Sequence, residues 1–486
     1  MTKFYRKKSF WLAGILLALL AGMWAEGAAQ APSPVPPQTT AEGQGAVASP
    51  EAKISPQEAD ELFRSVDQIL KFASQDTDLP IKHEVKRRLV GRDEVEAYVT
   101  KHTTEGEDAK RLRRAELVLK KFGLLPRDFD LSKFLVALLK EQVAGYYDSK
   151  TKTVNLLDWV QPALQKPVLA HELTHALQDQ FVGLERFMKP GERDLDREKQ
   201  ITPEDIVEDE AGTVRQAVTE GQAMAVLLDY MLAPAGKSLL DSPEVVAALK
   251  AGMMSGTPED VEFHDAPIYL KESLTFPYRD GLDFIAALLA KGGKEEAFAE
   301  TLRNPPHSTR QIMEPQTYLA GEVIPPMPLP DFNRDFKNYD RFDVGAVGEF
   351  DVSVIIDQYA GSEASRGLYP AWRGGYYYAA RPKGNSAAPL ALLYVSRWAS
   401  AQKAASFAAI YAKSLTKRYE HVQAAGDDPV GDLEKLDSLT GKHTWKTEEG
   451  DVEIDVNGDE VLAAESLDDA TVKKLEGEVF AALMVE

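Results

Sequence analysis

Apolar residues recur at helical spacing through the first two thirds of the chain. A first helix is predicted from Pro56, after the capping residue Ser55, because Leu62, Val66 and Ile69 then share one face. Similar patterns predict helices at residues 108–122, 132–139, 168–177, 210–231 and 276–288. Two β-rich runs, residues 143–148 and 153–157, flank a polar turn directly before the 168–177 helix and predict a hairpin. Residues 56–330 are therefore predicted to be mainly helical, with a small β hairpin or sheet.

The pattern changes after a proline-rich stretch at residues 321–340. Strand-like runs at 376–380, 390–395, 452–456 and 461–465 alternate with helical runs at 400–418 and 467–483. Asn457-Gly458, between two of the strands, is a strong signal for a hairpin turn. The fold class predicted for the whole chain is α+β, with a helical domain at 56–330 and a small α+β accessory domain at 340–486.

The N-terminus has the order of segments that is typical of a secretory signal peptide. Four basic residues precede an apolar run at residues 10–24, and small residues follow it: Lys3, Arg6, Lys7 and Lys8, then Gly27, Ala28, Ala29 and Ala31. We expect residues 1–31 to be a signal peptide and residues 32–55, rich in Pro, Ala, Gln and Gly, to be a disordered linker. An uncleaved membrane anchor is the alternative, although the apolar run falls short of the roughly 20 residues of a spanning helix. The protein is thus expected to be exported, either periplasmic or secreted.

Charge and cysteine content narrow the possible functions. The formal net charge is −21, which argues against binding of nucleic acid through a broad basic surface. The chain has no cysteine, so disulfides and lipoprotein attachment are excluded. Any metal site must use histidines and carboxylates.

The strongest chemical signal is His171-Glu172-Leu173-Thr174-His175, an HExxH motif within an apolar helical run. Residues four apart lie on one face of a helix, so both imidazoles can reach one metal ion. Glu172 directly follows the first histidine and can take a proton from a water on that ion. The motif predicts a Zn²⁺ site with Glu172 as the catalytic base.

Glu220 is the predicted third ligand. Two imidazoles leave a tetrahedral zinc ion with room for one more protein ligand and a water. Glu220 lies on or beside the apolar face of the 210–231 helix, and Gly221 and Ala223 would let that helix pack closely on another. Glu208, Asp209 and Glu210 are rival ligands, although acidic residues at a helix start also complement the helix dipole.

These residues resemble those of the gluzincins, the zincin metallopeptidases whose third zinc ligand is a Glu on a later helix. The resemblance covers roughly residues 130–320 and is specific only at His171, Glu172, His175 and the Glu-Gly-x-Ala element at Glu220. The chain departs from the thermolysin-like pattern because no Asn precedes Glu220, and it lacks the third His of the metzincins. It looks more like one of the uncharacterised exported bacterial gluzincin families than any well-studied one.

The resemblance implies roles for five more residues. In zincins a Tyr or His stabilises the oxyanion, and Tyr278 and His307 are the candidates here. An edge strand before the motif helix binds the substrate peptide in that group, and the hairpin at 143–157 stands in the corresponding place. Tyr146, Thr153 and Asn155 are the predicted substrate-binding residues on this edge.

The function expected from the sequence is that of an exported zinc-dependent peptidase, an endopeptidase acting on protein or peptide substrates. Glu172 would activate a zinc-bound water for attack on the peptide bond. Two alternatives remain open. One is a non-catalytic binding or structural protein that keeps the metal for stability, and the other is a zinc hydrolase of non-peptide amides.

Overall fold

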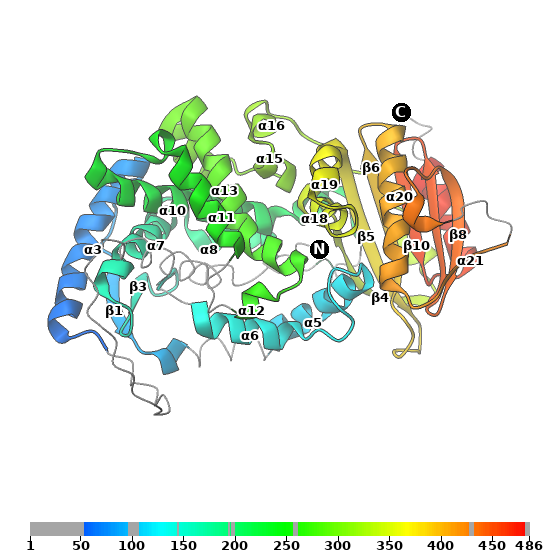
Figure 1. Cartoon of the computed structure of the whole chain (residues 1–486), viewed down its shortest axis with the longest axis horizontal. Helices are drawn as coiled ribbons and strands as arrows, with labels where there is room; N and C mark the ends of the chain where they lie inside the picture. Colours follow the sequence, from blue (N-terminus) through cyan, green and yellow to red (C-terminus); the bar gives the residue numbers. More distant parts are fainter. Residues whose placement is uncertain are drawn as a thin grey trace, which may run out of the picture.

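The computed structural model describes residues 53–95, 106–142, 145–192, 195, 200–255, 261–426 and 432–481. The fold is α+β, with a three-stranded mixed sheet and a seven-stranded antiparallel sheet at opposite ends of the molecule (Figure 1). The predicted signal peptide, and the predicted linker up to residue 52, lie outside the described residues. No helix within the described ranges is long and apolar enough to cross a membrane.

The predicted start of the first helix is confirmed. Helix α3 (Pro56–Thr77) begins with a capping box, in which Ser55 Oγ accepts from Glu58 N–H and the Glu58 side chain accepts from Ser55 N–H. Ile54 is already buried, and its N–H donates to Asp158 O at 2.8 Å. The last residues of the predicted linker, from Lys53 on, therefore belong to the folded body.

The small sheet has the order β1–β3–β2. Strands β2 (Tyr146–Asp148) and β3 (Thr153–Leu157) form the predicted antiparallel hairpin, while β1 (Lys86–Val90) pairs parallel to β3 on its other side. The expectation that Thr153 and Asn155 lie on an open edge is therefore wrong, because β3 is the central strand. Strands β1 and β2 form the two edges of this sheet.

Three long helices form the centre of the helical region: α7 (Pro162–Val182), α10 (Ala211–Leu232) and α13 (Ile268–Lys294). Helices α10 and α13 touch through their backbones at two glycines. A Cβ added to Gly221 would lie 2.2 Å from Gly281 O, and one added to Gly281 would lie 2.2 Å from Ala217 O. The close packing expected at Gly221 is thus present.

The sequence placed the start of α13 incorrectly. The helix was expected from Phe276-Pro277, since proline is common in a first helical turn, but it begins at Ile268 and holds Pro277 in its interior. The extra turns bury Tyr269, Leu270 and Leu274, and this packing outweighs the hydrogen bond that proline cannot donate.

Shorter elements complete the helical region. They are α5 (Gly106–Lys121), α6 (Leu131–Gln142), α8 (Leu184–Met188), α9 (Pro203–Glu208), α11 (Pro243–Ser255), α12 (Val261–His264), the π-helical turn η6 (Glu295–Glu300), α14 (Thr301–Arg303), α15 (Thr309–Met313) and α16 (Pro315–Leu319).

The C-terminal sheet has the order β4–β5–β6–β10–β9–β8–β7, and all its neighbours are antiparallel. The four predicted strands and two predicted helices are present, and Gly458 makes the expected hairpin turn with a φ of 61°. The bounds are β4 (Tyr339–Ala346), β5 (Trp372–Pro382), β6 (Ala391–Trp398), β7 (Val422–Ala424), β8 (Gly441–Thr447), β9 (Gly450–Asn457), β10 (Glu460–Glu465), α17 (Phe332–Asp335), α18 (Glu349–Ala360), α19 (Ser362–Leu368), α20 (Ala401–Arg418) and α21 (Asp469–Ala481).

The helical region and the C-terminal sheet share one hydrophobic core. Phe122, just after α5, packs edge-on against Tyr377 and Tyr394 of the sheet, with ring centroids 6.0 and 5.6 Å apart. Phe350 of α18 packs on Phe276 of α13 at 4.5 Å. Helices α18 and α19 fill the space between the two regions (Figure 1). The proline-rich stretch at 321–340 therefore separates two parts of the chain that remain packed together.

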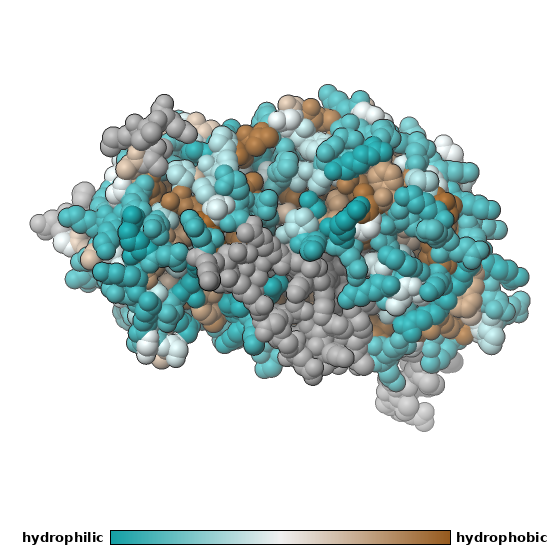
Figure 2. All heavy atoms as spheres, turned by 180° about the vertical axis from the view of Figure 1, so that it is seen from behind, coloured by the Kyte–Doolittle hydropathy of each residue, from teal (hydrophilic) through white to brown (hydrophobic). Residues whose placement is uncertain are grey.

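The face shown in Figure 2 is mostly hydrophilic where its residues are coloured. Four large apolar side chains are exposed in the described part of the chain: Ile81, Leu240, Leu319 and Val323.

Candidate metal centre

Helix α7 brings the two motif histidines together. Its residues from Val168 to Asp179 are buried, and His171 and His175 have exposed fractions of 0% and 1%. Their rings are perpendicular, with centroids 4.8 Å apart, and the two Nε2 atoms lie 3.1 Å apart. Both Nε2 atoms can therefore bind the same ion, as the helical spacing predicts.

Glu220 of α10 completes a triangle of ligand atoms. Its Oε2 lies 3.1 Å from His171 Nε2 and 3.4 Å from His175 Nε2, and the carboxylate is buried. Ligands about 2.0–2.1 Å from a tetrahedral ion are about 3.3 Å from one another. The three atoms match that spacing, so His171, His175 and Glu220 could hold a metal ion.

The rival carboxylates are engaged elsewhere or exposed. Glu210 Oε1 accepts from Thr309 N–H and Oγ1–H at 3.1 and 2.6 Å. Asp209 Oδ2 accepts from Ala346 N–H at 3.0 Å, and Glu208 is exposed. None of them belongs to the group of ligand atoms around His171.

The charges of the cluster favour a cation. Burial lowers the pKa of His171 to about 4. Burial acts in the same direction on His175, but the Glu220 carboxylate outweighs it and raises the pKa of His175 to about 9. Burial would raise the pKa of Glu220, yet the positive His175 and the hydrogen bonds from both imidazoles bring it to about 2. The buried carboxylate thus requires one positive charge beside it, and a divalent cation can replace that proton.

Glu172 is a buried carboxylate close enough to His175 and Glu220 for their charges to act on it. Its Oε2 accepts from Tyr147 N–H of β2 at 2.7 Å, while Oε1 is buried and has no hydrogen-bond partner among the described residues. Burial raises the pKa of the Glu172 carboxyl to about 8, and a neighbouring cation would lower it. Burying a carboxylate oxygen without a hydrogen-bond partner lowers the stability of the fold. Such an oxygen would gain a partner if a water or another molecule bound at the metal site.

The hairpin is fastened to α7 by contacts that the sequence did not reveal. Tyr147 Oη–H donates to Asp179 Oδ2 at 2.8 Å, and Lys152 Nζ lies 2.6 Å from the same oxygen. Asp179 Oδ1 accepts from Leu184 N–H at 3.0 Å. Tyr147 and Asp179 therefore fix the edge strand, and with it the N–H that orients Glu172. In the sequence, only the position of Asp179 one helical turn after His175 could have indicated a role for it near the site.

One of the candidate ligands, His175, has a partner that sequence reasoning missed, whereas His171 Nδ1 is buried without a hydrogen-bond partner among the described residues. His175 Nδ1 lies 2.8 Å from Gln178 Oε1, one turn later on α7. This contact leaves Nε2 of His175 as the ring atom that faces the other ligands. Such outer-shell partners orient ligating histidines in metal sites.

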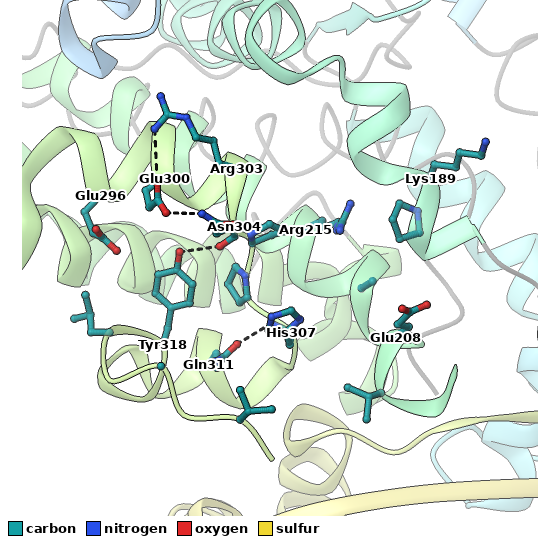
Figure 3. A pocket seen from close by; sticks show the side chains of 18 of the residues that line it. Lys189, Glu208, Arg215, Glu296, Glu300, Arg303, Asn304, His307, Gln311 and Tyr318 are labelled. Carbon is teal, nitrogen blue, oxygen red and sulfur yellow. Dashed lines mark hydrogen bonds and ion pairs between the residues drawn. The ribbon is translucent and has the colours of Figure 1, made fainter. Parts of the chain in front are cut away.

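Tyr278 lies beside the ligands, whereas His307 lies elsewhere. The Tyr278 ring stacks on the His171 ring at 6.4 Å with an angle of 22°, and it is buried. His307, in the loop before α15, lines a cavity of about 1340 Å³ together with Arg215, Gln311 and Tyr318 (Figure 3). Neither the three ligands nor Glu172 lines that cavity. Of the two predicted oxyanion donors, the structure places only Tyr278 next to the ligand set.

The predicted substrate-binding residues are buried within the small sheet. Asn155 Oδ1 accepts from Arg88 Nε–H at 2.7 Å, and its Nδ2 donates to Tyr146 O and Thr153 O at 3.3 and 3.2 Å. Asn155 therefore joins the three strands of the sheet. The edge beside the ligands is formed by β2, where Tyr147 N–H is already bound to Glu172.

Comparison of the chain with protein-family models, with curated proteins and with solved structures finds no match. The geometry of the site and the sequence motif are therefore the basis of any functional conclusion.

Proposed function

We propose that the chain is a zinc-dependent peptidase of the gluzincin type. The observation that carries the proposal is the triangle of His171 Nε2, His175 Nε2 and Glu220 Oε2 next to the free Oε1 of Glu172. Two imidazoles and one carboxylate are a donor set of catalytic zinc sites, which keep a further position open. A purely structural zinc site closes that position and has no use for a carboxylate with a free oxygen.

The roles of the residues follow from their positions. Zinc, when bound, would supply a Lewis acid that polarises the scissile carbonyl and lowers the pKa of a water. Glu172 Oε1 takes a proton from the attacking water and later gives it to the leaving amine. Tyr147 N–H holds the other oxygen of Glu172 and so fixes the direction of the carboxylate. In this proposal Tyr278, whose ring stacks on that of His171, donates its hydroxyl to the oxyanion.

One observation favours a second candidate, a zinc hydrolase of non-peptide amides. The edge strand β2 has three residues, and the N–H of its middle residue is bound to Glu172. Little of this edge is left to pair with an extended peptide. Export remains a proposal that rests on the signal-peptide pattern of residues 1–31.

Cleavage of a peptide library separates these functions. The purified protein, stripped of metal and then given one equivalent of Zn²⁺, is incubated with peptides from a whole proteome, and the products are sequenced by mass spectrometry. We expect cleavage with zinc, none after chelation, and recovery on adding zinc back. Tight zinc binding without any cleavage would contradict the peptidase proposal. Hydrolysis of small acyl amides alone would then support the second candidate.

Replacing Tyr278 by Phe should lower kcat by about 10²–10³-fold, the usual effect of removing one oxyanion donor. Zinc content should stay the same, because the ring and its stacking on His171 remain. The matched control is Tyr269→Phe, a buried tyrosine of the same helix whose hydroxyl donates to Asp351 at 3.2 Å. Equal kcat in the two variants would remove Tyr278 from the mechanism.

A further inference from the structure

Two buried glutamines connect the metal ligand His175 to a π-helical turn. Gln178 of α7 and Gln222 of α10 both have an exposed fraction of 0%. Gln178 Nε2 lies 2.9 Å from Gln222 Oε1, so the two side chains meet between the helices. Gln222 follows the ligand Glu220 by two residues, and one helix thus supplies both a ligand and this contact.

The backbone carbonyls of η6 fix the donor and acceptor of each hydrogen bond in this series. Gln222 Nε2 contacts two backbone carbonyls of η6, Ala297 O at 2.9 Å and Phe298 O at 3.0 Å. Carbonyl oxygens only accept, so the amide nitrogen of Gln222 must be on this side and its oxygen must face Gln178. A reversed amide would place its oxygen against both carbonyls.

The orientation of Gln178 is fixed in the same way, up to the histidine. Gln178 Nε2 donates to Gln222 Oε1 and also to Thr219 O, both at 2.9 Å. Its Oε1 therefore faces His175 Nδ1, at 2.8 Å, and can only accept. His175 must carry a proton on Nδ1, so Nε2 is the ring nitrogen that can offer a lone pair to a metal ion in the ligand triangle.

We propose that Gln222 is a positioning residue of the metal centre. The η6 carbonyls fix the orientation of the Gln222 amide, and Gln222 in turn fixes that of Gln178. Gln178 then holds the His175 ring with its proton on Nδ1 and its Nε2 toward the metal site. The inference rests on the proposed zinc site, but not on the reaction. It assigns the π-helical turn a role in ligand orientation, in agreement with the frequent occurrence of such turns at functional sites.

The experiment measures zinc affinity by competition with a chelator, and melting temperature without metal, for a set of glutamine variants of the full chain. Gln222→Met and Gln178→Met each remove a link, and we expect zinc affinity to fall about 10–100-fold, as for other outer-shell partners. If Gln222 acts through Gln178, the double variant should bind zinc no more weakly than Gln178→Met alone.

Two further variants separate orientation from stability. Gln165→Met is the matched control, because Gln165 is a buried glutamine of α7 whose partners among the described residues are backbone groups of Leu157 and Val160. It should lower the melting temperature and leave zinc affinity within a few-fold. Gln222→Glu keeps an acceptor toward Gln178, and its second oxygen keeps a donor toward η6 because burial beside two carbonyl oxygens favours the protonated carboxyl. It should likewise bind zinc within a few-fold of the unsubstituted chain, although it is less stable.

The outcomes are distinct. Unchanged zinc affinity in Gln222→Met, or losses that multiply in the double variant, would overturn the inference while the zinc site stands. A large loss of affinity in Gln222→Glu would also overturn it, and this variant decides the question if Gln222→Met does not fold. Absence of zinc binding in the unsubstituted chain would overturn both the proposed function and this inference.

Discussion

A Glu172→Gln variant is expected to bind zinc about as well as the unsubstituted chain and to lose about 10²–10⁴-fold in turnover, the usual contribution of general acid–base catalysis. Glutamine has the shape of glutamate, and its carbonyl oxygen can still accept from Tyr147 N–H, as Glu172 Oε2 does at 2.7 Å. The other half of the side chain becomes an amide, which cannot take a proton. Geometry is kept, and the base is lost.

The measurement is single-turnover cleavage of the best peptide from the library, with zinc content determined on the same samples. Glu185→Gln is the matched control, because Glu185 is an exposed glutamate on α8, just after α7. It should show full activity. Hydrolysis by Glu172→Gln within a few-fold of the control would mean that Glu172 is not the base.

Replacing Glu220 by Ala should abolish tight zinc binding. The carboxylate supplies one of three ligand atoms and the negative charge that offsets the ion. The loss of affinity should exceed the roughly 10–100-fold caused by loss of an outer-shell partner. Peptide cleavage should disappear at zinc concentrations that saturate the unsubstituted protein.

Glu208→Ala and Glu210→Ala test the assignment of the ligand. Both residues precede α10, but Glu208 is exposed and Glu210 is bonded to Thr309. Zinc stoichiometry after dialysis should remain one per chain in both variants. If Glu220→Ala keeps its zinc, or if zinc is lost with Glu208→Ala instead, the ligand triangle is wrong.

The parts of the site that depend on local spacing could be predicted from the sequence. His171 and His175 share a helix face by their separation alone, and Glu172 follows from its place in the motif. Glu220 needed one more step, a small neighbour that permits close helix packing, and Gly221 supplied it. The helices and strands with strong periodicity were likewise found near their predicted positions.

The parts that depend on distant segments could not be predicted. The hairpin was readable, but β3 became a central strand because β1, far earlier in the chain, pairs with its other edge. The α13 start was misplaced because tertiary packing overrides a local proline signal. Gln178 and Gln222 resemble ordinary polar residues of a helix until α7, α10 and η6 come together.

The contact between Gly221 and Gly281 has a consequence for how the centre responds to change. Because backbone atoms of α10 and α13 touch directly, side-chain volume in the surrounding core does not set the distance between these helices. Glu220 precedes the contact by one residue, so its backbone is held at a separation that most core substitutions leave alone. Substitutions in the apolar core would therefore lower the stability of the fold before they displaced Glu220. The arrangement of the metal ligands should therefore change little with most core substitutions. It should change most with substitutions of Gly221 and Gly281, which tolerate only glycine.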